Sequence, residues 1–98
     1  MATWTRQLQE REGDYFFSGQ FLITAGVQSE LSPEEVLIIY QNVQAFVREQ
    51  NGIDYLQVFT DEEDRKLFFI DQLSKQMIES GDYTEEHNIC TLMFAHEY

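Results

Sequence analysis

The chain has 98 residues, of which 18 are Asp or Glu and only 6 are Lys or Arg, so the formal net charge is −12 at pH 7. A charge of this size repels nucleic acid and anionic membrane surfaces and favours cationic partners, so we expect no direct binding to nucleic acid or to a membrane. Hydrophobic residues make up 43% of the chain, with eight Phe and five Tyr, which indicates one folded domain instead of a disordered acidic segment.

The sequence shows no signal for secretion or for a membrane anchor. The longest apolar run, Val36–Tyr40, is far shorter than a membrane-spanning helix requires, and the N-terminus lacks the apolar stretch of a secretory signal. Cys90 is the only cysteine, so no disulfide can form within the chain, which fits a reducing compartment. We therefore expect a cytoplasmic protein.

The N-terminal residues 1–13 are predicted to form a tail or a short helix, in which Trp4 and Leu8 stand four positions apart and share one face. Residues 14–98 then make up a single domain. Its first element is predicted to be a long strand from Tyr15 to Val27, because aromatic and β-branched residues are enriched there.

The stretch Ser32–Gln50 is predicted to be the main helix. Ser32 provides the N-cap, Pro33 suits the first helical position, and Glu35 completes a capping box. Apolar residues then recur at helical spacing and form a single stripe that suits packing on a sheet; these are Val36, Ile39, Tyr40, Val43, Phe46 and Val47.

Further along the chain, two β-rich runs, 55–60 and 67–73, flank the polar loop Asp61–Arg65 and predict a hairpin. A short helix is expected over residues 74–80 and a last strand over 89–95. The predicted fold is therefore α+β: a mostly antiparallel sheet of about four strands with one long helix packed on one face, in the order β-α-β-β-(short α)-β.

Both faces of the predicted hairpin carry large apolar side chains. Leu56 and Val58 lie on one face, Tyr55 and Phe59 lie on the other, and the second strand alternates in the same way. Since one long helix covers only one face, the other must be covered by the N-terminal segment, by the short helix or by another chain, either a second copy or a partner. The predicted apolar interface residues are Tyr55, Phe59 and Phe69.

Four stretches, ITAGVQSELSPEE, DYLQVF, FFID and CTLMFAHEY, give the chain a resemblance to a bacterial family of small proteins, domain of unknown function 960. The resemblance covers roughly residues 21–98. It implies a compact fold and no particular activity. Because proteins of this kind look at home on phages and plasmids, it also favours an anti-defence role.

Few residues in the chain suggest catalysis or metal binding. His87, Cys90 and His96 are the only soft ligands, and Cys90 and His96 on one extended strand would stand roughly 20 Å apart, too far for a shared zinc ion. The acidic loop Asp61–Asp64 has no glycine for the bend of a calcium loop and is more typical of a solvated turn. We expect no cofactor, no metal and no enzymatic activity, with Cys90 as a small core residue.

Two functions fit these observations. The first is a non-enzymatic inhibitor, similar in action to an anti-CRISPR protein, whose carboxylates replace phosphates on the basic surface of a nucleic-acid-handling protein such as a defence nuclease. Its predicted contacts are Glu30, Glu34, Glu35, Asp61, Glu62, Glu63, Asp64, Asp82, Glu85 and Glu86. The second is a small dimeric accessory or structural module that works through its aromatic sheet face, with the charge serving only solubility.

Overall fold

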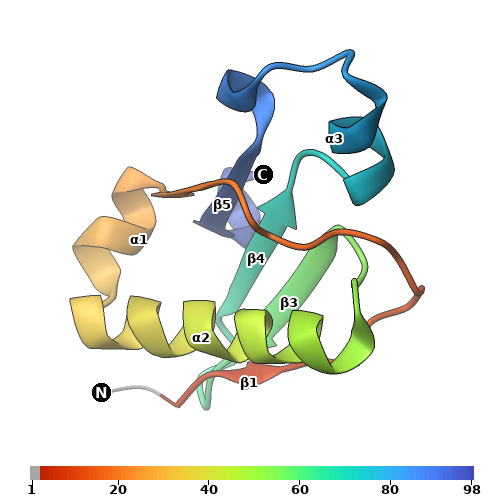
Figure 1. The fold of residues 1–98 in the computed structure, drawn as a ribbon. Coiled ribbons are helices and arrows are strands. Elements are labelled where there is room, and N and C mark those ends of the chain that lie inside the picture. Colours follow the sequence, from red (N-terminus) through yellow and green to blue (C-terminus); the bar gives the residue numbers. More distant parts are fainter. Residues whose placement is uncertain (1–2) are drawn as a thin grey trace.

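The computed structural model describes residues 3–98 as a five-stranded sheet with the long helix α2 lying across one face (Figure 1). The strand order is β1-β3-β4-β5-β2. In chain order the elements are β1 (Thr5–Arg6), β2 (Gln20–Ile23), α1 (Ala25–Glu30), α2 (Pro33–Gln50), β3 (Leu56–Thr60), β4 (Lys66–Asp71), α3 (Lys75–Ser80), η1 (Glu85–His87), β5 (Ile89–Phe94) and η2 (Ala95–Glu97).

The predicted main helix is confirmed in detail. The Ser32 hydroxyl accepts a hydrogen bond from the Glu35 N–H, and the Glu35 carboxylate accepts one from the Ser32 N–H, so the capping box is complete. Asn51 ends the helix in the left-handed conformation, with φ of 55°. The stripe through Ile39, Val43 and Val47 is buried against the sheet.

The α+β fold, the hairpin, the short helix and the last strand are also confirmed. β3 and β4 pair antiparallel with Leu56 opposite Ile70, and β4 pairs antiparallel with β5. The sheet is mostly antiparallel because only β2 and β5 run parallel, with Phe21 opposite Cys90. The strand order places β2 at one edge of the sheet and β1 at the other.

The structure corrects two predictions near the N-terminus. Thr5–Arg6 forms the edge strand β1 on β3 instead of part of a tail or a helix; residues 1–2 of that predicted segment lie outside the described residues. The predicted strand 15–27 is also wrong at both ends. Phe17 has a φ of 49°, which interrupts an extended run, and Thr24 caps helix α1 by accepting a hydrogen bond from the Val27 N–H.

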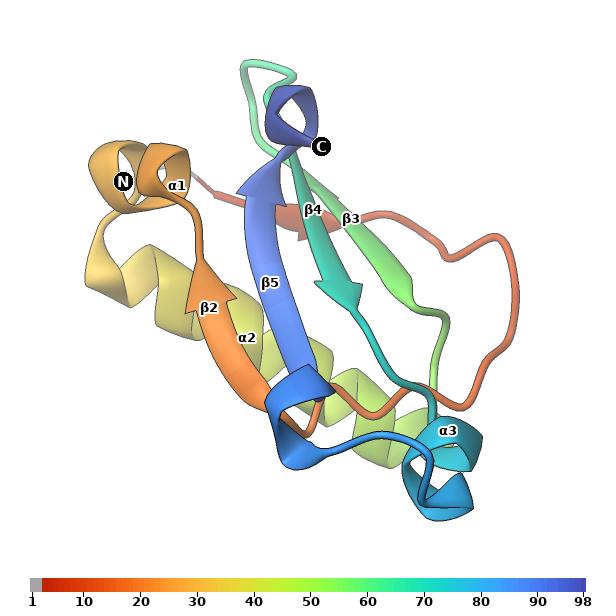
Figure 2. The ribbon, with the colours of Figure 1, turned by 90° about the horizontal axis from the view of Figure 1, so that it is seen from above.

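The core lies between α2 and one face of the sheet. β3, β4 and β5 each alternate between a buried and a partly exposed side chain, so Phe59 and Phe69 point toward α2 and are fully buried. The opposite face carries Leu56, Val58, Phe68, Ile70 and Met93, all partly exposed. We call these five side chains the open face. In Figure 2, α2 lies behind the sheet, on the other side from this face. At one end of the open face, the Tyr98 ring packs edge-on against Phe68 with 5.9 Å between the ring centroids.

Candidate interaction surfaces

The structure separates the ten predicted acidic contacts into available and unavailable side chains. Glu35 and Asp61 are only 8% exposed each. Glu35 is held by Ser32 and by the Trp4 indole N–H at 3.0 Å, while Asp61 is held by Arg65 at 2.7 Å. These two carboxylates stabilise the fold and cannot contact a partner, so their prediction as contacts is wrong. The other eight acids are exposed.

The pKa values of Glu35 and Asp61 reflect these contacts. Burial raises the pKa of Glu35, but hydrogen bonds from Ser32 and Trp4 outweigh it and leave the pKa below the usual value. Burial likewise raises the pKa of Asp61, but hydrogen bonds from the side chain and backbone of Arg65 lower it further than burial raises it. Both groups therefore stay ionised in the folded protein and contribute stability that is lost only in acid.

The eight available acids do not form one patch, because they lie at two ends of the sheet. Glu62, Glu63 and Asp64 occupy the tip of the β3–β4 hairpin, and Glu30 shares a pocket with Asp64 there. Glu34 lies in the first turn of the adjacent helix α2. We call these five residues the tip end.

The remaining three acids lie at the other end of the strands, beyond α3. What we call the acidic lobe consists of Glu79, in the last turn of α3, and of Asp82, Glu85 and Glu86, in the connection between α3 and β5 (Figure 2). The six residues of β4 separate the two ends, which corresponds to roughly 20 Å of extended chain.

The two ends differ in how many cations accompany them. Arg65 and Lys66 follow directly after the acids of the tip end, whereas no Lys or Arg follows Lys75 in the chain. Lys75 forms a loose ion pair with Glu79 at 3.8 Å between two exposed side chains, which screens little charge. Within residues 3–98, the only acids that form ion pairs are Asp61, Glu63 and Glu79. The acidic lobe therefore has fewer cations beside it, although the tip end contains more acids and is at least as negative by formal charge.

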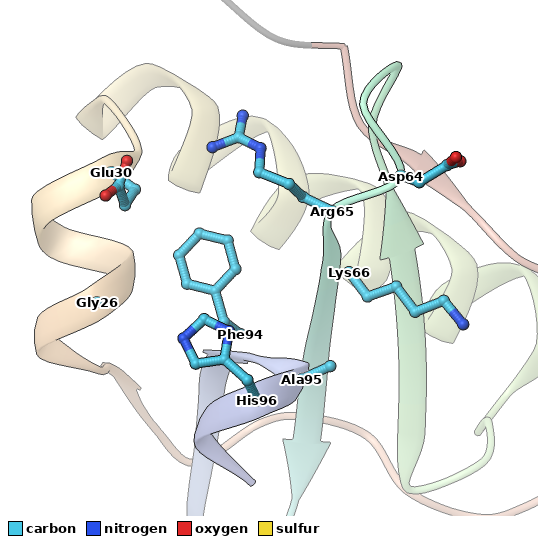
Figure 3. Close-up of a pocket in the computed structure, with 8 residues that line it drawn as sticks. All are labelled: Gly26, Glu30, Asp64, Arg65, Lys66, Phe94, Ala95 and His96. Atoms are coloured by element: carbon cyan, nitrogen blue, oxygen red, sulfur yellow. The ribbon is translucent and has the colours of Figure 1, made fainter.

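A pocket of about 560 Å³ lies between the tip end and η2 (Figure 3). Arg65 reaches into it, and the His96 ring stacks on Phe94 with 5.5 Å between the ring centroids. Arg65 is already paired with Asp61, and its guanidinium lies 5.3 Å from the centre of the Trp4 ring. Asp61 therefore offsets part of the positive charge that Arg65 brings to the pocket.

The structure also contains a buried polar cluster that the sequence analysis did not single out. One carboxylate oxygen of Asp71 accepts a hydrogen bond from the Phe17 N–H at 2.9 Å, while the other has no partner among the described residues. Gln44 donates to the Phe17 carbonyl at 2.7 Å. Burial raises the pKa of Asp71 to about 6, despite the opposing hydrogen bond from Phe17. The period-two pattern Leu67, Phe69, Asp71 was the available signal, since it places Asp71 on the buried face.

The predicted soft ligands lie apart and have local contacts. Cys90 is fully buried opposite Asp71, and burial, aided by the Asp71 charge, raises the pKa of its thiol to about 12, which keeps the thiolate form scarce at neutral pH. His87 pairs with the Thr84 hydroxyl. Across residues 3–98, no three His, Cys, Asp or Glu side chains stand close enough together to hold a metal ion.

The apolar interface prediction is corrected as well. Phe59 and Phe69 belong to the core, as described above, so they cannot form an interface. Tyr55 is 40% exposed and packs against Tyr15 with 6.0 Å between the ring centroids and 57° between the ring planes. The partly exposed apolar surface of the sheet is the open face, which lies on the other side of the sheet from Phe59 and Phe69.

A second apolar surface was missed by the sequence analysis altogether. A groove of about 580 Å³ runs beside β2, between that strand and the two helices α1 and α2. Its lining includes Phe21, Ile23, Leu31, Leu37 and Tyr40. No local pattern could reveal it, because the groove exists only once β2 is placed at the edge of the sheet.

Comparisons of the chain with protein-family models, with curated proteins and with solved structures found no match. The resemblance to domain of unknown function 960 therefore stays a prediction. In the part of the chain that the structure describes, no helix has the length and apolar character needed to cross a membrane.

Proposed function

We propose that this protein is a non-enzymatic acidic interaction protein, and that it acts as an anti-defence inhibitor by occupying the basic, nucleic-acid-binding surface of another protein. The observation that carries this proposal is the acidic lobe. Its three outermost acids, Asp82, Glu85 and Glu86, are exposed and have no ion-pair partner among residues 3–98. A basic cleft that evolved to bind phosphates offers them complementary charge.

The tip end supports the same proposal with a second negative group. Glu62, Glu63 and Asp64 project from the hairpin tip, where the Asp61–Arg65 pair fixes the turn: Asp61 accepts hydrogen bonds from the backbone N–H groups of Glu63 and Arg65. These hydrogen bonds hold the backbone of the turn that carries the three exposed carboxylates. Preorganised charges lose less conformational entropy on binding than charges on a flexible loop.

Affinity capture with two matched variants tests the proposal. The first variant carries Asp82→Asn, Glu85→Gln and Glu86→Gln in the acidic lobe, and the second carries Glu62→Gln, Glu63→Gln and Asp64→Asn at the tip end. Each removes three exposed charges and leaves Glu35 and Asp61 in place. The immobilised proteins are exposed to lysates of candidate host bacteria, and retained proteins are identified by mass spectrometry.

We expect the unmodified chain to retain a basic nucleic-acid-binding protein that duplex DNA displaces. The lobe variant should retain at least about tenfold less of it, because desolvated charge pairs in interfaces contribute a few kcal/mol, and the tip variant should lose less. Retention of acidic or neutral proteins alone, or retention that both variants and DNA leave unchanged, would contradict the proposed function.

The open face favours a second function, that of a dimeric accessory module. Five partly exposed apolar side chains on three adjacent strands lie on the face opposite α2, and a contiguous apolar patch on a protein surface can mark an interface. A molecular mass measured by light scattering distinguishes the two. Under this second function the chain is a dimer at micromolar concentration, and a variant with Phe68→Glu is a monomer.

A further inference from the structure

The outer edge of β2 presents backbone groups that have no strand beside them. The N–H groups of Gln20 and Thr24 donate to Asn88 and Leu92 on the β5 side, at 2.9 and 3.2 Å. Because these groups alternate along a parallel strand, the N–H and C=O of Phe21 and Ile23 point away from β5. β2 is the edge strand of the sheet, so these groups face the solvent side of the groove.

The groove beside this edge suits the side chains of an added strand. Phe21 and Ile23 point toward the α2 layer, and the Phe21 ring packs against Tyr40 with 4.7 Å between the ring centroids and 31° between the ring planes. Ile23 is 37% exposed and Leu37, on the opposite wall, is 53% exposed. The volume of about 580 Å³ falls within the usual range of binding pockets, about 300–1,000 Å³. Alternate side chains of a strand paired with β2 would enter this space.

Charge at the two ends of the groove indicates what kind of strand fits. Glu30 and Glu34 stand at one end, on either side of Leu31 and Pro33, which line the groove. Glu85 stands at the other end, where it shares a small pocket with Gln20. All three carboxylates are exposed. A strand that is apolar in its centre and basic at both ends complements this arrangement.

We propose that the outer edge of β2 and its groove bind an extended segment of the basic partner, which adds a strand to the sheet with apolar side chains in the groove and basic residues at both ends. Main-chain hydrogen bonds to Phe21 and Ile23 contribute affinity, and the groove contributes sequence preference. This proposal rests on the proposed function, because that function supplies the basic partner. The partner's positive charge is the reason why the groove binds its strand in preference to strands of other proteins.

The test uses isotope-labelled protein and three peptides with blocked ends. The probe is Lys-Val-Thr-Val-Thr-Val-Lys. The first control is the same peptide with N-methyl groups on its valines, which keeps the charge and side chains but blocks strand pairing. The second control, Lys-Gly-Ser-Gly-Ser-Gly-Lys, keeps only the charge. Binding and its location are read from NMR chemical shifts, and the amide exchange rates of Phe21 and Ile23 are measured with and without peptide.

Two protein variants, Leu37→Lys and Ile38→Lys, complete the design. Both residues are exposed on α2, at 53% and 56%, and both changes add the same charge, but only Leu37 lines the groove. We expect the probe to slow exchange at Phe21 and Ile23. Leu37→Lys should weaken binding about tenfold or more, as the loss of a contact central to an interface does, and Ile38→Lys should cost a few-fold at most.

The outcomes separate this inference from the proposed function. If the probe and both controls bind equally, with shifts confined to the acidic lobe and the tip end, strand addition is wrong and the acidic proposal stands. If no peptide binds at millimolar concentration in low salt, both are wrong. Probe binding that maps to the open face, or that Leu37→Lys and Ile38→Lys weaken equally, also overturns strand addition at β2.

Discussion

Replacing Asp71 by Asn should remove a specific part of the pH dependence of stability. Asp71 is 3% exposed, and burial raises its pKa to about 6 from the ordinary 3.8. The folded protein therefore binds this proton more tightly than the unfolded chain does, and stability falls as the pH rises between these two values. The Asn side chain keeps an oxygen that accepts from the Phe17 N–H but carries no charge.

The expected magnitude follows from the two pKa values. A gap of about 2 units corresponds to about 3 kcal/mol over the whole range, of which about 1.3 kcal/mol falls between pH 5 and pH 7. We choose the interval from pH 5 to pH 7 for the measurement because solubility is low near the isoelectric point, which is about 4.2. We expect the variant to gain about 1 kcal/mol relative to the wild type between pH 5 and pH 7.

The assay is urea unfolding, followed by far-UV circular dichroism at several pH values from 5 to 8. Taking the difference between wild type and variant cancels the other acids, including Glu35 and Asp61, whose lowered pKa values act in the opposite direction. Asp71→Leu serves as the control, because it leaves the buried Phe17 N–H without an acceptor and should destabilise the protein at every pH. A wild-type to Asn difference that stays constant from pH 5 to pH 7 would refute the account of Asp71.

Three further changes test other parts of the structure. Glu35→Ala removes both the capping box and the Trp4 contact, so urea unfolding should show a loss of about 1–3 kcal/mol, and an unchanged midpoint would contradict the role of Glu35. Gly19→Ala places a methyl group against the Asn88 carbonyl, so the melting temperature should fall by an amount that corresponds to a loss of about 1–3 kcal/mol in the free energy of unfolding. A higher melting temperature would show that the Asn88 backbone moves aside and that the contact does not constrain residue 19. Phe68→Glu changes a partly exposed residue of the open face and should cost less in the same unfolding assay than the loss of a core phenylalanine, which costs about 3–5 kcal/mol; an equal loss would contradict the placement of Phe68 outside the core.

The parts of the fold that were predicted correctly depend on local signals. The capping box at Ser32 and Glu35, the stripe on α2 and the left-handed stop at Asn51 lie within a single helix and need no tertiary information. The hairpin follows from two β-rich runs joined by a short polar loop. In each case neighbouring residues determine the conformation, which is why the sequence alone suffices.

The predictions that failed depend on contacts between distant residues. Thr5–Arg6 becomes a strand because β3 offers an edge to pair with, and a two-residue strand leaves no pattern of its own. Phe17 turns away from the extended conformation where Asp71, far along the chain, accepts its N–H. These choices depend on the assembled sheet.

The candidate contacts show the same division. Composition predicted an acidic surface, and eight of the ten named acids are exposed, but it could not show that Glu35 and Asp61 are used internally. Alternation along β3 and β4 predicted two apolar faces. It could not show which face α2 would cover, and the choice of Phe59 and Phe69 for the interface therefore failed.

The most direct test of the central claim is the salt dependence of binding between this chain and the basic partner it captures, with duplex DNA as a competitor. If exposed carboxylates occupy a phosphate-binding surface, affinity should fall by about tenfold or more between 50 and 200 mM salt, and DNA should displace the chain. Affinity that does not change with salt, or a complex that binds DNA and this chain at the same time, would contradict the claim.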